Sequence, residues 1–188
     1  MKIGLTIDTP ATAVADAQQT EQLGFDYVAS EVEPLVRGKT WEEMKPGSSF
    51  RTAKRTVTEA DLIQFITWGG FNEALFFDAS HASAGGYTGR LIPGAMIYCI
   101  AEGLVVQTNV LNGTGLAFVS MELSVRKRVY VGDTLHAIVT TTESRASSRP
   151  GRGVVTARVS VRNQRDEEVL VFMPVRLIRG ADYQEAQR

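Results

Sequence analysis

The sequence predicts an α+β protein in which an antiparallel sheet wraps around one long central helix. Residues 95–111 are apolar on nearly every side, which is typical of a buried helix. The last third of the chain alternates apolar and polar residues in long runs that are joined by short turns, a pattern of antiparallel strands. These runs are residues 115–129, 133–146, 152–164 and 168–180. Packing the helix on one face of such a sheet buries both, so we expect an antiparallel meander that covers the helix.

A further strand and a capped helix are expected ahead of the buried helix. Residues 50–58 alternate as a strand does. Thr58 then has the side chain of a helix N-cap, and Asp61 occupies the third helical position as in a capping box. The apolar face of this helix is expected to contain Leu62, Phe65, Ile66 and Trp68, and two glycines end it. Within residues 95–111, Met96 and Cys99 are expected in the core, where both residue types usually lie.

The first part of the chain differs in character. Residues 1–31 read as strand, helix and strand, a βαβ-like unit in which Thr9 and Pro10 begin the helix. Residues 33–49 form a connector rich in turn-forming residues, with Trp41 and Met44 as apolar anchors. We therefore predict an N-terminal extension and linker at residues 1–38 and a second domain at residues 39–188.

Composition narrows the classes of function. The formal net charge is −1, which argues against nucleic acid as the main partner. With one cysteine and two histidines, neither an internal disulfide nor a cysteine metal cluster is expected, and we predict no metal and no cofactor. The N-terminus lacks the long apolar core of a signal peptide, and no apolar run is long enough to span a membrane. These features favour a soluble cytoplasmic protein that makes no membrane contact.

Several motifs carry a resemblance to a known family. They are TWEEMKPGSSF, RTVTEADLIQF, GGFNEALFFDASHA, GRLIPGAMIYCIAEGL and VYVGDTLHA. Residues of about 39–180 that contain them resemble the MaoC-like acyl dehydratases. The resemblance implies a hot-dog fold, a homodimer, and binding of an acyl group carried as a thioester on coenzyme A or an acyl carrier. It also implies a lyase reaction, the reversible addition of water to a 2-enoyl thioester.

The N-terminal segment resembles a different family. MKIGLTI and TEQLGFDYVASE are similar to the opening strand–helix–strand of luciferase-like flavin monooxygenases. Such enzymes are complete (β/α)₈ barrels, and one unit cannot form a barrel. We therefore infer no flavin chemistry from this segment.

The residues that the family uses for proton transfer are replaced in this chain. The resemblance implies an Asp and a His in the pattern D-x-N-P-x-H, which fall here at Gly70 and at either Leu75 or Phe76. None of these side chains carries a proton. Three functions stay open: a rewired hydratase or dehydratase homologue, a non-catalytic acyl-thioester-binding or partner subunit, and an acyl-CoA thioesterase.

Three nearby side chains are candidates for proton transfer. Asp78 and His81 are three residues apart, so on a helix they share a face and the carboxylate could orient the imidazole. The alternative is that Asp78 caps a turn and His81 lies on the surface. Glu73 could serve as a base if the loop buried it, because burial favours the protonated form of a carboxyl. The alternative for Glu73 is a solvent-facing loop residue.

Substrate-binding candidates surround the same stretch. Gly94 follows Pro93 at the start of the buried helix, where free N–H groups carry positive potential and a glycine lets a thioester carbonyl approach. The alternative is that Pro93 and Gly94 simply begin the helix. Asn72, Phe76 and Tyr87 are expected to contact the ligand, with turn geometry as the alternative for Asn72 and a turn aromatic for Tyr87. The basic run at 126–128 would suit the phosphates of coenzyme A, or is a solvated strand end.

Overall fold

The computed structural model describes residues 36–184. The expected strand–helix–strand unit at residues 1–31 therefore lies outside the described residues, and the predicted domain boundary stays a prediction. No helix among the described residues is long and apolar enough to cross a membrane.

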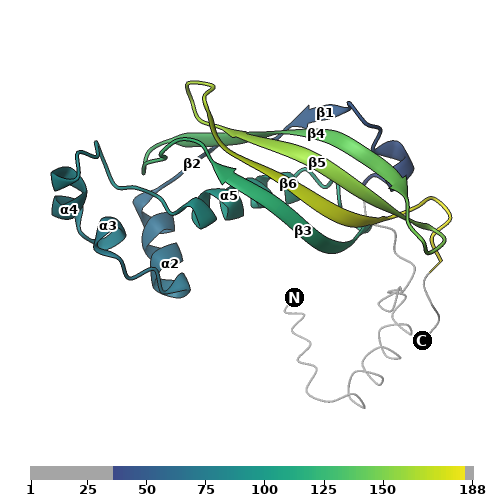
Figure 1. Ribbon diagram of the computed structural model, residues 1–188, viewed down its shortest axis with the longest axis horizontal. Helices are drawn as coiled ribbons and strands as arrows, with labels where there is room; N and C mark the ends of the chain where they lie inside the picture. Colours follow the sequence, from purple (N-terminus) through teal and green to yellow (C-terminus); the bar gives the residue numbers. More distant parts are fainter. Residues whose placement is uncertain (1–35, 185–188) are drawn as a thin grey trace, which may run out of the picture. The chain divides into compact units, whose positions relative to one another are not determined.

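One curved antiparallel sheet dominates the fold (Figure 1). Its strands are β1 (Ser49–Arg51), β2 (Arg55–Thr56), β3 (Gly115–Val125), β4 (Thr134–Ala146), β5 (Arg152–Arg162) and β6 (Glu168–Arg179). They are ordered β1-β4-β5-β6-β3, and β2 also pairs with β4. The last three strands agree with their predicted ranges within two residues, so the period-two alternation located them well.

The position of β3 differs from the expected meander. Strands β4, β5 and β6 do follow one another as neighbours, but β3 pairs with β6 at the far edge instead of with β4. It also ends at Val125, because the N–H groups of Arg126 and Lys127 both donate to the carbonyl of Val169 and turn the chain. The segment that follows crosses back to β4 past Leu91, which bridges to Tyr130.

The long helix α5 (Gly94–Val106) lies against the concave face of the sheet, as predicted (Figure 1). Its buried face interlocks with inward side chains of β4, β5 and β6 in the main core. The helix ends five residues before the predicted position, since the Thr108 hydroxyl donates to the Val105 carbonyl and Asn109 adopts a φ of 59°. Met96 is buried as predicted. The core prediction for Cys99 is wrong, because this residue lies on a flank of α5 that the sheet leaves exposed.

Helix α2 (Glu59–Gly69) begins as its sequence predicts. The Thr58 hydroxyl accepts a bond from the Asp61 N–H at 3.2 Å, and the Asp61 carboxylate accepts one from the Thr58 N–H at 2.9 Å. Leu62 and Ile66 are buried, but Trp68 is 88% exposed. Trp68 lies two residues beyond Ile66, and residues at that spacing do not share a helix face, so its assignment to the apolar face is wrong.

The expected strand at 50–58 is two short strands. β1 and β2 both pair with β4, and the regular pairing is interrupted at residues 52–54, although the Thr52 N–H still donates to the Ala137 carbonyl at 2.9 Å. Here the N–H of Ala137 donates to the Thr52 hydroxyl at 2.9 Å instead of to a backbone carbonyl. A side-chain acceptor of this kind competes with regular strand pairing.

The connector before β1 is anchored as predicted. A short 3-10 turn, η1 (Trp41–Glu43), places Trp41 beside a second apolar cluster of Met44, Val155 and Ile178. A side chain on Gly153 would collide with the Trp41 ring, its Cβ falling 2.2 Å from Trp41 Cγ. The glycine therefore lets the indole lie directly on strand β5.

Candidate functional site

A pocket of about 630 Å³ opens at the N-terminal end of α5. Its walls come from four parts of the chain: the short helix α3 (Ala74–Phe77), the segment Leu91–Gly94 with the first turns of α5, the end of β3, and the turn between β5 and β6. Figure 1 shows α2, α3 and α4 (Ala79–Ala84) gathered at this same end of the sheet.

The α3 wall of the pocket is apolar. Leu75 and Phe76 both line it and are half-buried. Phe76 is held edge-on by Phe71, with ring centroids 6.4 Å apart, and Phe71 packs on Phe65 of α2 at 5.3 Å. This chain of rings connects the pocket wall to the main core.

The start of α5 forms the floor of the pocket. Pro93 stands at the N-cap and Gly94 is the first helical residue. The first N–H groups of an α-helix precede its regular hydrogen bonds and carry a partial positive charge. In α5 the Met96 N–H donates to the Pro93 carbonyl at 2.9 Å, so the N–H groups of Gly94 and Ala95 are the ones that could meet a ligand. Gly94 has no side chain that would cover them, so the pocket floor suits an electron-rich oxygen such as a carbonyl.

The mouth of the pocket is basic. Arg126, Lys127 and Arg128 follow β3, and Arg165 approaches from the β5–β6 turn. Glu167 lies among them and joins Lys127 at 2.7 Å and Arg165 at 2.9 Å. Hydrogen bonds from Asn163, Lys127 and Arg165 lower the pKa of Glu167 to about 2. Glu167 is thus a fixed anion that holds the basic rim together and is a poor proton carrier near neutral pH.

The three candidates for proton transfer are exposed. Glu73 stands before α3, Asp78 follows it, and His81 lies on α4. Asp78 accepts bonds from the Ser80 hydroxyl at 2.6 Å and the Ser80 N–H at 2.8 Å. The pKa of Asp78 is lowered chiefly by the Ser80 hydroxyl and then by the N–H groups of His81 and Ser80. This is the geometry of a turn cap, the alternative that the sequence left open for Asp78.

Of the binding candidates, Gly94 and Phe76 are brought together in the pocket. Asn72 lies in the exposed loop between α2 and α3. Tyr87 is half-buried, and the Arg128 guanidinium lies 4.7 Å from the centre of its ring. Tyr87 therefore supports the basic rim through a cation–π contact.

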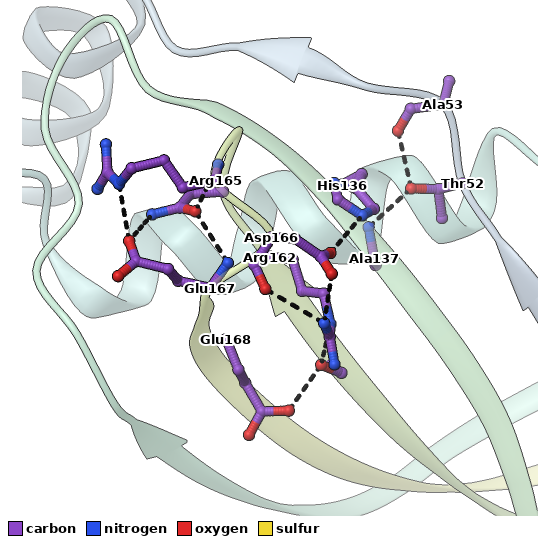
Figure 2. Close-up of polar contacts among 11 residues, drawn as sticks. Thr52, Ala53, His136, Ala137, Arg162, Arg165, Asp166, Glu167 and Glu168 are labelled. Atoms are coloured by element: carbon purple, nitrogen blue, oxygen red, sulfur yellow. Dashed lines mark hydrogen bonds and ion pairs between the residues drawn. The ribbon is translucent and has the colours of Figure 1, made fainter.

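His136 takes part in a separate polar cluster on the other face of the sheet. Figure 2 shows its ring directed at Asp166, with an Nε2 to Oδ1 distance of 3.9 Å, and Arg162 joined to the same carboxylate at 3.0 Å. His136 is buried, and its Nδ1 has no hydrogen-bond partner among the described residues. Burial first, and the charge of Lys54 second, lower the pKa of His136. This agrees with a structural role for this residue.

Sequence reasoning did not identify several residues of the pocket. Val125, Arg165 and Glu167 reach it only because β3 pairs with β6 at the edge of the sheet. Alternation along a strand does not reveal which strand lies beside it. Within the described residues no group of three or more His, Cys, Asp or Glu side chains could hold a metal ion, and the prediction of no cofactor stays untested.

The model of the MaoC-like domain family matches residues 42–163, well over half of the chain. The chain belongs to this family. A curated relative is the protein MaoC of Klebsiella aerogenes, 33% identical over 72 residues, which are 38% of this chain. The match spans only 22% of that protein's length.

Solved structures agree with this assignment. A monoamine oxidase regulatory protein from Archaeoglobus has a TM-score of 0.72 and 27% identity, covering 78% of this chain and 97% of the other. A MaoC-like dehydratase from Rhodospirillum rubrum has a TM-score of 0.70 and 26% identity, with coverage of 78% and 100%. A Mycobacterium tuberculosis protein described as a double hot-dog fold has a TM-score of 0.66 at 21% identity, covering 79% and 47%. The predicted hot-dog fold is confirmed.

Proposed function

We propose that this protein binds an acyl thioester of coenzyme A or an acyl carrier in the pocket at the start of α5. The thioester carbonyl would lie at the first turn of α5 beside Gly94, where helix N–H groups favour an oxygen. The acyl group would lie against Leu75 and Phe76, and phosphate would meet the rim of Arg126, Lys127 and Arg128. Charged side chains and an apolar wall in one pocket match the two ends of such a ligand.

One observation supports the proposal that this pocket binds its ligand without transferring protons to or from it. The resemblance assigns the family's histidine to Leu75 or Phe76, and both side chains line the pocket next to Gly94. The pocket therefore has an apolar surface where an acid–base group would be needed. Among the described residues that line it, Glu167 is the one carboxylate, and its pKa of about 2 does not suit a general base.

Membership of a dehydratase family favours a second candidate, the addition or removal of water. Glu73, Asp78 and His81 are then the groups that would transfer protons. Their exposure means that this reaction would need the loop to close over a bound ligand. A thioesterase that uses Glu73 or Asp78 to activate water is the remaining alternative.

We also propose that the protein acts as a homodimer. Strand β3 is an edge strand, and an edge with free backbone groups is a site for pairing with another chain. Exposed apolar side chains along it, including Phe118, Val119 and Leu123, favour burial against a second copy. Light scattering of the purified protein tests this proposal, and a monomer at micromolar concentration would contradict it.

The cytoplasmic location stays a prediction.

Calorimetric titration with butyryl-CoA, crotonyl-CoA and free CoA tests the binding proposal. We expect both acyl thioesters to bind, and the variant Lys127→Glu to weaken them by disturbing the basic rim. The matched control is Lys45→Glu, an exposed lysine ahead of β1 that does not line the pocket. Absence of binding for all three compounds would overturn the proposal.

A further inference from the structure

Arg90 directly precedes Leu91–Gly94, a segment that lines the pocket. Its backbone is fixed, because its carbonyl accepts a bond from the Val131 N–H at 2.9 Å and the Ile92 N–H donates to the Val129 carbonyl at 3.0 Å. The residue is therefore anchored to the segment that leads from β3 to β4. From this position its side chain extends toward the helices at the end of the sheet.

The guanidinium of Arg90 joins two helices. Nη1 lies 2.5 Å from Oε1 of Glu59 in the first turn of α2, and Nη2 donates to the Phe76 carbonyl of α3 at 2.5 Å. The Arg90 side chain is 22% exposed, so these charge-assisted bonds are partly shielded from water. A guanidinium suits this task because its rigid fork presents donors in two directions at once.

Helix α3 depends on such outside support. It has four residues and none of them is buried. A helix of this length is unstable in water unless other contacts hold it. Its attachments in the described structure include the packing of Phe76 against the main core, the Phe71–Phe76 ring contact and the bond from Arg90 to the Phe76 carbonyl.

We propose that Arg90 is a positioning residue that holds the Leu75–Phe76 wall of the pocket in place. Its role is to let the pocket distinguish an acyl thioester from free coenzyme A, since the acyl group is the part that meets this wall. The inference about discrimination rests on the proposed acyl-thioester function, whereas the inference about the position of α3 does not. The two parts therefore require separate measurements.

Hydrogen exchange of the unliganded protein tests the position of α3. The Phe76 N–H donates to the Glu73 carbonyl and the Asp78 N–H to the Ala74 carbonyl. Loss of a charge-assisted bond weakens such local structure, so Arg90→Met should speed exchange of these amides about tenfold or more while α5 amides keep their rates. Glu59→Gln keeps the bond to Phe76 and should give a smaller change. The matched control is Arg158→Met, which removes an ion pair between Arg158 of β5 and Glu168 of β6.

Titration with free CoA, butyryl-CoA and octanoyl-CoA tests discrimination. In the wild type we expect acyl thioesters to bind more tightly than free CoA. Arg90→Met should lose most of the difference in affinity between acyl thioesters and free CoA, while its affinity for free CoA stays the same. Arg90→Lys should keep part of that difference in affinity. Unchanged α3 exchange and unchanged acyl preference in Arg90→Met would overturn the inference. If the wild type bound no acyl-CoA while α3 exchange rose as expected, the proposed function would fail and the positioning of α3 by Arg90 would stand.

Discussion

Gly94 and Val125 approach so closely that no side chain fits between them. A Cβ on Gly94 would lie 2.9 Å from Cγ2 of Val125, so the first turn of α5 and the end of β3 meet at the floor of the pocket. Gly94→Ala should push the Val125 side chain into the pocket and cover the helix N–H groups. We expect the dissociation constant for butyryl-CoA to rise about tenfold in calorimetric titration, equivalent to the loss of roughly one ligand hydrogen bond.

A matched control exists in the same helix. A Cβ on Gly103 would meet no atom of the described residues within 4 Å. Gly103→Ala should therefore leave binding unchanged and stabilise α5 by up to about 1 kcal/mol, the difference in helix propensity between the two residues. Equal affinity in Gly94→Ala and the wild type would show that the ligand does not use the start of α5.

Much of the fold was predictable because its signals are local. The cap of α2 needs only Thr58 and Asp61, and the alternation of β4, β5 and β6 lies within each strand. The edge position of β3 and the exposure of Cys99 were not predictable in this way. Both depend on which elements lie next to each other, and residue periodicity does not contain that information.

The site was predictable in part for the same reason. Gly94 and Phe76 were each identified from a contiguous motif of their own, and both line the pocket. Arg165 and Glu167 lie far along the chain, and reach the pocket through strand pairing alone. For Asp78 a local pattern was not sufficient, because its spacing to His81 is compatible with proton transfer and with capping. The hydrogen bonds from Ser80 in the structure match a cap.

The cap of α2 gives a direct test of stability. Thr58→Ala removes the hydroxyl that accepts the Asp61 N–H, and such losses cost about 1 kcal/mol of unfolding free energy. Urea denaturation followed by circular dichroism measures the change. Thr67→Ala, at an exposed position of the same helix, serves as the control and should not destabilise the protein. A loss of similar size in both variants would contradict the role of Thr58 as a cap.

The ion pair between α5 and β6 gives a second test. Both carboxylate oxygens of Glu102 lie within 2.7 Å of Arg176 Nη2, and the Arg176 side chain is 10% exposed. Glu102→Ala leaves this buried guanidinium without its partner, which should cost about 3 kcal/mol of unfolding free energy. The double variant Glu102→Leu with Arg176→Met should recover most of this loss in the same urea experiment. A double variant less stable than Glu102→Ala would show that the charge was not the cause.

The stability of the protein should depend on pH through His136. Its pKa in the folded state is lowered, by burial first and by Lys54 second, so the unfolded chain binds the proton more readily. The free energy of unfolding should therefore fall as the pH decreases below about 6.5, the ordinary pKa of histidine. His136→Gln should flatten this dependence in thermal unfolding between about pH 5 and 7. The exposed His81→Gln is the control, and an unchanged slope in His136→Gln would contradict the assignment.

The central claim is that the pocket binds an acyl thioester without changing it. Mass spectrometry of the purified protein incubated with crotonyl-, 3-hydroxybutyryl- and butyryl-CoA tests this claim most directly. We predict unchanged masses for all three compounds, together with measurable binding of butyryl-CoA. Gain or loss of one water that disappears in Asp78→Ala, His81→Ala or Glu73→Ala would contradict the claim and locate a rewired hydratase, and release of free CoA would identify a thioesterase.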